Sequence, residues 1–293
     1  MISAIAFPDL SPIIFEIELF GFNLALRWYA LAYIVGITLG WFIMRAALRR
    51  DRLWPDSIAP MPTARMEDLL TYVVIGVIAG GRLGYVLFYQ PDYYLANPIE
   101  IPMIWTGGLS FHGGFLGVVA GVWLFSRRNA VPLGQLSDAI AIAAPPAVLL
   151  VRLANFVNAE LWGRPTDLPW GVIFPGEAAQ TCPGVMGACA RHPSQLYEAG
   201  LEGLLLGGGL LLLAFVWGGL KKPWLATGTF FAGYGIARFS VEFVRQPDAQ
   251  FQEPGNPLGW AFTVGDYGLT MGQILSLPMI LVGVALIVMA RRR

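Results

Sequence analysis

The chain has 293 residues, of which 56% are hydrophobic and only 13% charged, and its mean hydropathy is +0.60. A soluble domain carries about 25% charged residues, so this composition excludes an ordinary soluble domain and predicts a polytopic membrane protein. The 19 basic and 19 acidic residues balance, so no global basic field points to nucleic acid as a partner.

Apolar windows of about 20 residues mark transmembrane helices. We expect an all-α fold with seven of them. The predicted spans are Leu24–Met44, Leu69–Tyr89, Ser110–Phe125, Ser137–Phe156, Leu196–Trp217, Gly228–Val244 and Gly268–Ala290. The first span is expected to direct insertion, because the preceding residues lack the basic region and small-residue cleavage site of a signal peptide.

Glycines recur every fourth residue in the second and third predicted spans. They are Gly76, Gly80 and Gly84, and then Gly113, Gly117 and Gly121. Such ridges of small residues let membrane helices approach closely. Helix packing is therefore their predicted main role.

The segments that connect the spans alternate in charge. The second connection carries Asp92 and Glu100 and no basic residue. Basic residues occupy the first, third and fifth connections and the tail: Arg45, Arg49, Arg50, Arg52 and Arg65; Arg127 and Arg128; Lys221 and Lys222; and Arg291, Arg292 and Arg293. The positive-inside rule therefore predicts an extracytoplasmic N-terminus and a cytoplasmic C-terminus, and seven spans require the same parity.

The longest predicted outer segment, residues 157–193, is too polar to span a membrane and too rich in Pro and Gly for a long helix. We expect a small folded extracytoplasmic cap within a single integral-membrane domain of residues 1–293. Cys182 and Cys189 lie in this segment. They form either a disulfide or two free thiols, and both alternatives remain open. Only His192 lies near them, so no metal site is expected.

With this orientation, the polar residues of the spans gather toward the outer leaflet. They are Arg27, Tyr29, Arg82, His112, Arg152, Asn155, Gln195, Glu198, Glu202, Arg238, Glu242 and Arg245. An arginine at bilayer depth costs at least about 2.5–3.5 kcal/mol, so such residues by default mark a functional site. Arginine binds carboxylates and phosphates through paired donors, which indicates an anionic ligand.

Spacing places some of these residues on shared helix faces. Arg152 and Asn155 are separated by three positions and lie on one face of the fourth predicted span. A stripe on the sixth comprises Tyr234, Arg238, Glu242 and Arg245. Arg238 and Glu242 have an alternative, purely structural interpretation as an ion pair. His112 is likewise either a packing residue or a general base, since histidine exchanges protons near neutral pH.

No nucleotide-binding, metalloprotease or serine-hydrolase motif is present in the sequence. No cofactor is therefore expected. The candidate site contains arginines, carboxylates and a histidine, but no obvious nucleophile, so a substrate is expected to supply it.

Several sequence blocks together resemble the prolipoprotein diacylglyceryl transferase family. They occur in family order and span most of the chain. The blocks are Gly80-Gly81-Arg82-Leu83-Gly84-Tyr85; Gly107-Gly108-Leu109-Ser110-Phe111-His112-Gly113-Gly114; Arg152 through Arg164 with the pattern Arg-x-x-Asn-Phe-x-Asn-x-Glu-x-x-Gly-Arg; His192-Pro193-Ser194-Gln195-Leu196-Tyr197-Glu198; and Arg238-Phe239-x-x-Glu242-Phe243-x-Arg245-Gln246-Pro247-Asp248. The stretches 51–62 and 174–190 do not align, and nothing is carried onto them.

The resemblance implies a transferase of the bacterial inner membrane that starts lipoprotein maturation. Its substrates would be phosphatidylglycerol and the lipobox peptide of a prolipoprotein. The diacylglyceryl group would move to the lipobox cysteine thiol, and glycerol 1-phosphate would leave. The substrate cysteine would then be the missing nucleophile, and the active site would face the outer leaflet.

The resemblance also suggests roles for individual residues. Arg152 and Arg238 would hold the phosphate, and His112 would deprotonate the thiol. Asn155, Glu160 and Gly163 would shape the site. Glu242 would orient Arg238, and Tyr29 and Arg245 would line the headgroup region. Arg82 and Glu198 have either functional or structural roles.

Two other function classes remain open on the residues alone. A transporter would need polar groups accessible from both sides and usually an internal repeat, and no clear repeat is present. A lipid-binding scaffold would bind the headgroup without releasing glycerol phosphate. Acyl-chain preference and oligomeric state are not predicted.

Overall fold

The computed structural model describes residues 4–19, 21–182, 187–247, 251, 255–256, 258–265 and 267–292. Asp248 and Arg293 lie outside the described residues. The chain forms two compact units. The first comprises Met1–Met44 and Ile140–Arg293, and the second comprises Arg45–Ala139.

The chain is mostly helical. The helices are α1 (Trp28–Leu48), α2 (Met66–Phe88), α3 (Pro91–Ala96), α4 (Phe111–Arg128), α5 (Leu133–Ala143), α6 (Pro145–Val157), α7 (Glu177–Gln180), α8 (Ser194–Glu198), the π-helical η6 (Ala199–Leu205), α9 (Leu206–Phe215), α10 (Leu225–Val241) and α11 (Met271–Arg292). Short 3₁₀ turns are η1 (Asp51–Leu53), η2 (Pro55–Ser57), η3 (Thr63–Arg65), η4 (Pro98–Glu100), η5 (Ile104–Thr106) and η7 (Gly219–Lys221). The strands are β1 (Ile5–Ala6), β2 (Ile13–Leu19), β3 (Phe22–Arg27), β4 (Val172–Ile173), β5 (Trp260–Val264) and β6 (Tyr267–Thr270).

Within the described residues, five helical stretches are long and apolar enough to cross a membrane. They are Trp28–Leu48, Thr63–Phe88, Leu133–Val157, Ser194–Phe215 and Met271–Arg292. These five overlap five of the seven predicted spans. The other two predicted spans overlap α4 and α10, which have 18 and 17 residues.

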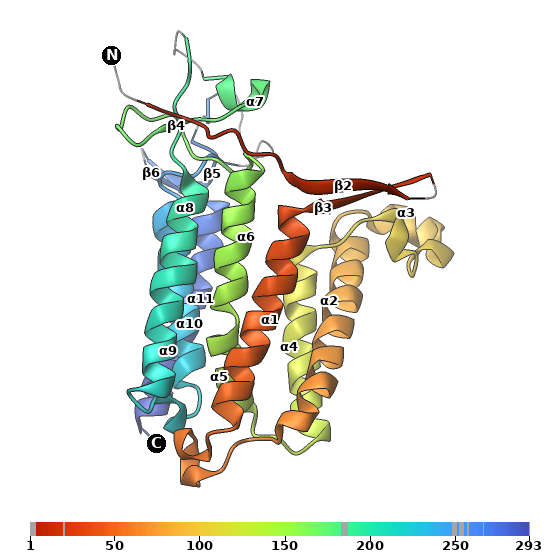
Figure 1. Cartoon of the computed structure of the whole chain (residues 1–293), viewed down its shortest axis with the longest axis vertical. Helices are drawn as coiled ribbons and strands as arrows, with labels where there is room; N and C mark the ends of the chain where they lie inside the picture. Colours follow the sequence, from red (N-terminus) through yellow and green to blue (C-terminus); the bar gives the residue numbers. More distant parts are fainter. Residues whose placement is uncertain are drawn as a thin grey trace. The chain divides into compact units, whose positions relative to one another are not determined.

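The second unit contains the close helix pair α2 and α4, which run side by side (Figure 1). A Cβ atom added to Gly117 would lie 1.9 Å from the carbonyl oxygen of Gly76, and one added to Gly80 would lie 2.4 Å from that of Gly113. Only glycine permits this backbone separation. The predicted packing role of the two glycine ridges is therefore confirmed.

In the first unit, α1 packs closely on the α5–α6 segment. A Cβ at Gly36 would lie 2.5 Å from the Cα of Ala147, and one at Gly40 would lie 2.5 Å from the carbonyl oxygen of Ala143. Helices α5 and α6 are separate where the sequence predicts one span, because Pro145 and Pro146 interrupt the backbone hydrogen bonds between them.

Helices α8, η6 and α9 follow one another directly from Ser194 to Phe215. The central π-helical segment was not predicted. A Cβ at Gly203 in this segment would lie 2.6 Å from the Cα of Leu149, so η6 approaches α6 closely. Such π-helical turns often occur at functional sites.

Of the predicted cap segment, residues 157–182 and 187–193 are described, and they contain a short strand and a small apolar core. Strand β4 pairs in parallel with β1, and Val172, Phe174 and Ala179 form a small apolar core with partly buried aromatic neighbours. The two cysteines, Cys182 and Cys189, form a disulfide, with their Cα atoms 6.2 Å apart. Of the two alternatives left open by the sequence, the structure has the disulfide.

The guanidinium of Arg191 holds the interior of this segment. The residue is 2% exposed, and its guanidinium carbon lies 4.0 Å from the ring centre of Trp162. It donates to the carbonyl oxygens of Ala179, Gly163 and Thr181. Burial lowers the pKa of Arg191 from its ordinary value. The side chain therefore stabilises the cap by satisfying carbonyl groups that would otherwise be buried unpaired.

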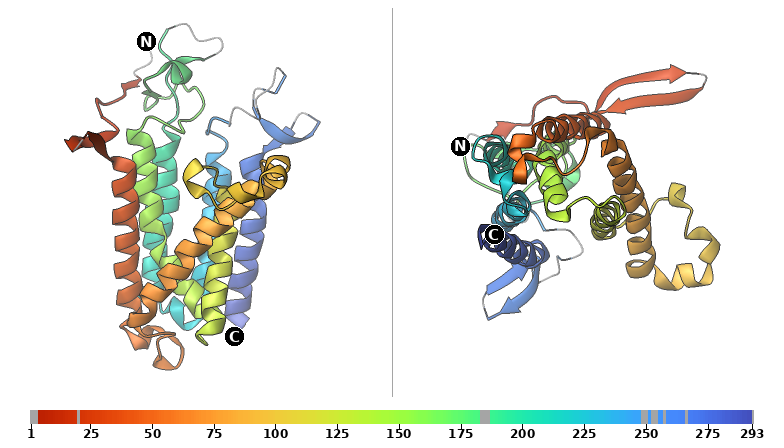
Figure 2. Two further views of the ribbon diagram at one scale, coloured as in Figure 1. Left: turned by 90° about the vertical axis from the view of Figure 1, so that its right-hand side faces the viewer. Right: turned by 90° about the horizontal axis from the view of Figure 1, so that it is seen from below.

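Two antiparallel hairpins depart from the all-α expectation. They are β2–β3, which leads into α1, and β5–β6, which leads into α11 (Figure 2). Leu24 and Gly268 therefore lie in strands, and the predicted first and seventh spans begin too early. In β2, the apolar and acidic side chains alternate with the two-residue period of a strand, and this short pattern was missed beside the longer apolar helix that follows.

Candidate functional site

A chain of ion pairs joins three helical segments of the first unit. Arg152 of α6 contacts Glu198 and Glu202, each with a nitrogen–oxygen distance of 3.1 Å. Glu198 also contacts Arg238 of α10 at 3.5 Å. Arg238 pairs in turn with Glu242, which lies 3.5 Å from Arg245. We call these six residues the ion-pair chain: Glu202, Arg152, Glu198, Arg238, Glu242 and Arg245.

The two signs of charge in this chain differ in exposure. The side chains of Arg152, Arg238 and Arg245 are 18%, 18% and 14% exposed, whereas those of Glu198 and Glu202 are fully buried. The buried carboxylates neutralise the guanidiniums from the interior of the protein. The accessible side of the cluster therefore presents hydrogen-bond donors and positive charge, which favours an anion.

Local structure explains how the carboxylates reach Arg152. Glu198 ends α8 and Glu202 lies inside η6. A π-helical turn is wider than an α-helical one, and both carboxylates face the same guanidinium across the close contact of η6 with α6.

Glu242 is held from a fourth segment, at the start of α11. Its carboxylate accepts a hydrogen bond of 2.6 Å from the hydroxyl of Thr270. A Cβ at Gly272 would lie 2.4 Å from the Glu242 carboxyl carbon, so the absence of a side chain there makes room for the carboxylate. Glu242 therefore pairs with Arg238 from a fixed position. This ion pair is compatible with both interpretations of the sequence, an orienting role for Glu242 and a purely structural pair, and the orienting role stays a prediction.

A second group of polar side chains lies one helical turn from the ion-pair chain, toward the cap end of α6 and α8. The amide nitrogen of Asn155 donates to the Tyr29 hydroxyl at 3.2 Å and to the Glu160 carboxylate at 2.8 Å. The amide nitrogen of Gln195 donates to the backbone carbonyl of Glu160. We call Tyr29, Asn155, Glu160 and Gln195 the amide cluster.

Gly163 lies where three backbone segments meet. Its N–H donates to the carbonyl oxygen of His192 at 2.8 Å, and it forms a bridge with Arg245. A Cβ at this position would lie 2.5 Å from the carbonyl oxygen of Val244. Gly163 therefore permits close backbone packing beside Arg245, and its role in the site stays a prediction.

Arg82 belongs to the second unit and has structural partners there. The residue is 3% exposed, and its guanidinium donates to the carbonyl oxygens of Glu100, Ile101, Gly107 and Gly108. These bonds use the donors that a phosphate would need. The structural interpretation of Arg82 is therefore favoured.

His112 also belongs to the second unit, where it is exposed in the first turn of α4. The hydroxyl of Ser110 caps this helix by accepting from the N–H of Gly113 at 3.2 Å. The assignment of His112 as a base stays a prediction.

The other histidine, His192, lies outside the predicted spans. Trp170 donates to the Tyr197 hydroxyl at 2.8 Å, and that hydroxyl lies 3.2 Å from Nδ1 of His192. Because the Tyr197 oxygen already accepts from Trp170, its own proton is available for Nδ1. Burial lowers the pKa of His192, which favours the neutral ring that can accept this proton.

His112 and Arg82 belong to the second unit, whereas the other residues to which the resemblance gives a role belong to these connected groups of the first unit. Sequence reasoning placed Glu202 and Gln195 in the same span but assigned them no role, and it missed Thr270. Periodicity did contain a signal, because Gln195, Glu198 and Glu202 recur at helical spacing.

Comparison with known proteins gives a consistent result. The family model described as prolipoprotein diacylglyceryl transferase matches residues 12–289. A protein of Ruegeria pomeroyi named phosphatidylglycerol–prolipoprotein diacylglyceryl transferase is 64% identical, with 99% of each chain covered. Proteins of the same name from Cereibacter sphaeroides and Brucella anthropi are 61% and 45% identical, covering 99% and 96% of this chain and 99% and 92% of their own length.

These matches extend across the hairpins, the cap and the ion-pair chain. They also agree with the composition and the apolar helices of a multi-pass membrane protein. The chain belongs to the prolipoprotein diacylglyceryl transferase family.

Proposed function

We propose that Arg152 and Arg238 bind the phosphate of phosphatidylglycerol while this transferase moves the diacylglyceryl group to a prolipoprotein. The activity is that of the family. The observation that carries the residue assignment is the ion-pair chain, in which two guanidiniums are partly exposed and joined by a fully buried carboxylate.

The reaction explains why two arginines are needed. The thiolate of the precursor cysteine attacks the carbon of the diacylglyceryl group, a C–S bond forms, and the C–O bond to phosphate breaks. The phosphodiester carries one negative charge, whereas the departing glycerol 1-phosphate carries a second. Donors aimed at this developing charge lower the barrier, and removing one such donor typically costs about 10²–10³ in rate.

The thiol must lose its proton before attack, and we assign this step to His112. A free thiol has a pKa of about 8.5, so a base increases the thiolate fraction at neutral pH. His112→Gln is expected to slow transfer at pH 7 and to recover activity as the pH is raised toward 9, where the thiolate forms unaided. A constant defect across this pH range would contradict the assignment.

An apolar groove supports lateral entry of the lipid. It has a volume of about 290 Å³ and is lined by Trp28, Leu31, Ala32 and Val35 of α1 and by Leu150, Leu153, Ala154 and Val157 of α6. Its α6 side neighbours Arg152 and Asn155 in the chain. We propose that an acyl chain of the donor lies here, with the headgroup toward the arginines.

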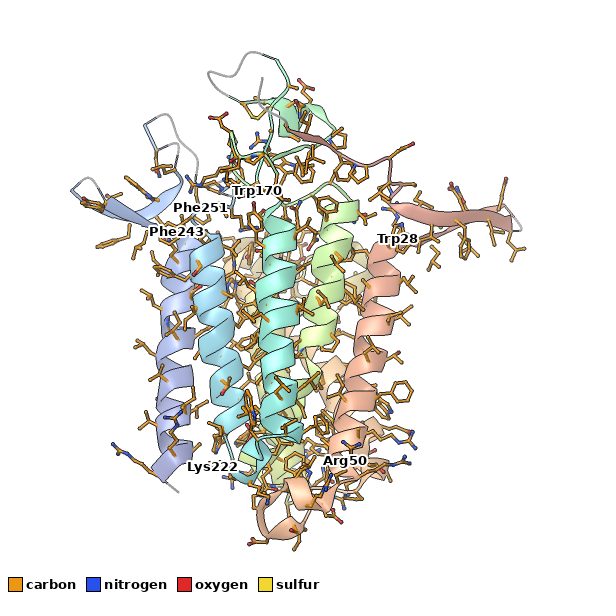
Figure 3. All side chains as sticks on the ribbon, turned by 60° about the vertical axis from the view of Figure 1, so that its left-hand side comes forward. Trp28, Arg50, Trp170, Lys222, Phe243 and Phe251 are labelled. Carbon is orange, nitrogen blue, oxygen red and sulfur yellow. A yellow bond between two sulfur atoms is a disulfide. The ribbon has the colours of Figure 1, made fainter. Side chains whose placement is uncertain are left out.

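We further propose seven membrane crossings, with the N-terminus and the cap outside the inner membrane. At about 1.5 Å per residue, α4 and α10 are each about 26 Å long, close to the thickness of a hydrocarbon core. In the first unit, Trp170 and Phe243 lie toward the cap end and Lys222 toward the opposite end (Figure 3). The positive-inside rule then supports a cytoplasmic location for Lys222 and an outer-leaflet site.

The decisive experiment uses purified protein, labelled phosphatidylglycerol and a lipobox peptide. The wild type is expected to form a thioether-linked product and to release glycerol phosphate. Arg238→Gln is expected to lose about 10²–10³ in rate. Arg292→Gln, on an exposed arginine at the far end of α11, is the matched control and should transfer normally.

Normal transfer by Arg238→Gln would overturn the phosphate-binding role. Lipid binding without a thioether product in the wild type would instead favour the scaffold alternative. Movement of lipid across vesicles without that product would favour a transporter.

A further inference from the structure

Both amide side chains of the amide cluster have an oxygen atom that is left without a hydrogen bond. Within the described residues, Asn155 Oδ1 and Gln195 Oε1 are buried without a hydrogen-bond partner. The side chains belong to residues that are 1% and 0% exposed. A buried acceptor left unpaired costs about 1–3 kcal/mol, so two such atoms beside a ligand site need an explanation.

The orientation of both amides follows from their donors. The amide nitrogen of Asn155 donates to the side-chain carboxylate of Glu160. The amide nitrogen of Gln195 donates to the backbone carbonyl of Glu160. Neither group of Glu160 can donate in these contacts when its carboxylate is ionised, so the nitrogens must lie there. The two oxygens are therefore left as acceptors for a ligand that carries hydrogen-bond donors.

The positions of these oxygens match one part of the lipid. Asn155 follows Arg152 by three residues on α6, and Gln195 precedes Glu198 by three residues on α8. Three residues advance about 4.5 Å along a helix, so the amides lie one turn from the ion-pair chain toward the cap. In phosphatidylglycerol, the two headgroup hydroxyls likewise lie a few bonds beyond the phosphate, on the side away from the acyl chains.

We propose that Gln195 and Asn155 form the subsite that recognises the glycerol headgroup, each accepting a hydrogen bond from one of its hydroxyls. The proposal rests on the proposed binding of the phosphate by Arg152 and Arg238. Gln195 is then a specificity-determining residue. A headgroup without hydroxyls leaves the acceptors unpaired, and a cationic headgroup places its ammonium beside two guanidiniums.

The test compares lipids that differ only in these hydroxyls. The donors are phosphatidylglycerol, phosphatidyl-1,2-propanediol, phosphatidyl-1,3-propanediol and phosphatidylpropanol, each with the same lipobox peptide. We expect the wild type to lose about 5- to 150-fold in kcat/KM when the hydroxyl that Gln195 binds is absent. Gln195→Met is expected to lose a similar factor with phosphatidylglycerol and to stop discriminating at that hydroxyl.

Gln180→Met is the matched control, because the Gln180 amide oxygen already accepts from the N–H of Cys189 at 3.0 Å. It should keep the wild-type ratio between the lipids. Equal losses by Gln195→Met with all donors would assign Gln195 a structural role and overturn the proposal. Equal use of phosphatidylglycerol and phosphatidylpropanol by the wild type would also overturn it without relying on any variant.

The results with the wild type distinguish failure of the headgroup subsite from failure of the proposed function. Normal transfer by the wild type without discrimination between the four lipids removes only the headgroup subsite. Failure of the wild type to transfer from any of the four lipids would count against the proposed function itself.

Discussion

Removing Arg152 together with one carboxylate partner separates its role in folding from its role in the reaction. In Arg152→Met, Glu202 loses both of its contacts with Arg152. Among the basic residues that the structure describes, Glu198 keeps only Arg238, at 3.5 Å. Both carboxylates are fully buried. Breaking a buried pair from one side typically costs about 3–5 kcal/mol, so the single variant is expected to be strongly destabilised.

The double variant Arg152→Met/Glu202→Met removes one charge of each sign and keeps the cluster neutral. Replacing a buried pair by apolar side chains is often close to neutral, so we expect most of the lost stability to return. The phosphate contact stays absent, and transfer should remain about 10²–10³ below the wild type. Glu202→Met alone is the companion variant that completes the thermodynamic cycle.

Two measurements on the same detergent-solubilised samples decide the matter. Thermal unfolding reports stability, and formation of the thioether product from labelled lipid reports activity. A double variant that is stable and transfers at the wild-type rate would refute a role of Arg152 in the reaction. Single and double variants of equal instability would refute the ion-pair argument.

Three further predictions concern the helix pair and the cap. Gly117→Ala places a methyl group 1.9 Å from the Gly76 carbonyl oxygen and should destabilise the fold by about 1–3 kcal/mol or more, whereas Gly114→Ala, with its nearest atom at 3.6 Å, should unfold near the wild-type temperature. Cys182→Ser opens a disulfide whose partners are seven residues apart and should cost about 2.5 kcal/mol, seen as faster proteolysis of the cap under conditions where the wild type resists. Burial lowers the pKa of His192, so below about pH 6.5 the unfolded chain binds more protons than the folded chain. The free energy of unfolding should therefore fall as the pH drops from about 6.5 through the folded-state pKa. Urea titrations at several pH values should show this dependence in the wild type and a flatter one in His192→Gln.

Long apolar periods and charged residues within them predicted much of the architecture. Five apolar helical stretches long enough to span a membrane, and the glycine contacts between α2 and α4, were predictable from local pattern, as were the positions of the arginines within or beside apolar helices. Their signals are local because a membrane imposes length and polarity on each helix separately. Strands were missed, since their short alternating patterns adjoin much longer apolar helices.

The partners of the charged residues were harder to predict from the sequence. Sequence spacing paired Arg238 with Glu242, which are four residues apart. It could not show that Glu198 of α8 contacts both Arg152 of α6 and Arg238 of α10. Likewise, Arg82 had the same appearance in the sequence as Arg152. Only the packed structure shows that backbone carbonyls occupy its donors.

The sequence alone determined that this is a multi-pass membrane protein with an arginine-containing site and the motifs of its family, because composition, periodicity and motif order are properties of the chain itself. The tertiary structure decided which groups in that site remain available to a ligand. Availability depends on contacts between distant segments, and the free energy of a buried polar group depends on whether those contacts satisfy it. Asn155 and Gln195 were visible in the sequence, but their unpaired oxygens emerge only when both amide nitrogens meet Glu160.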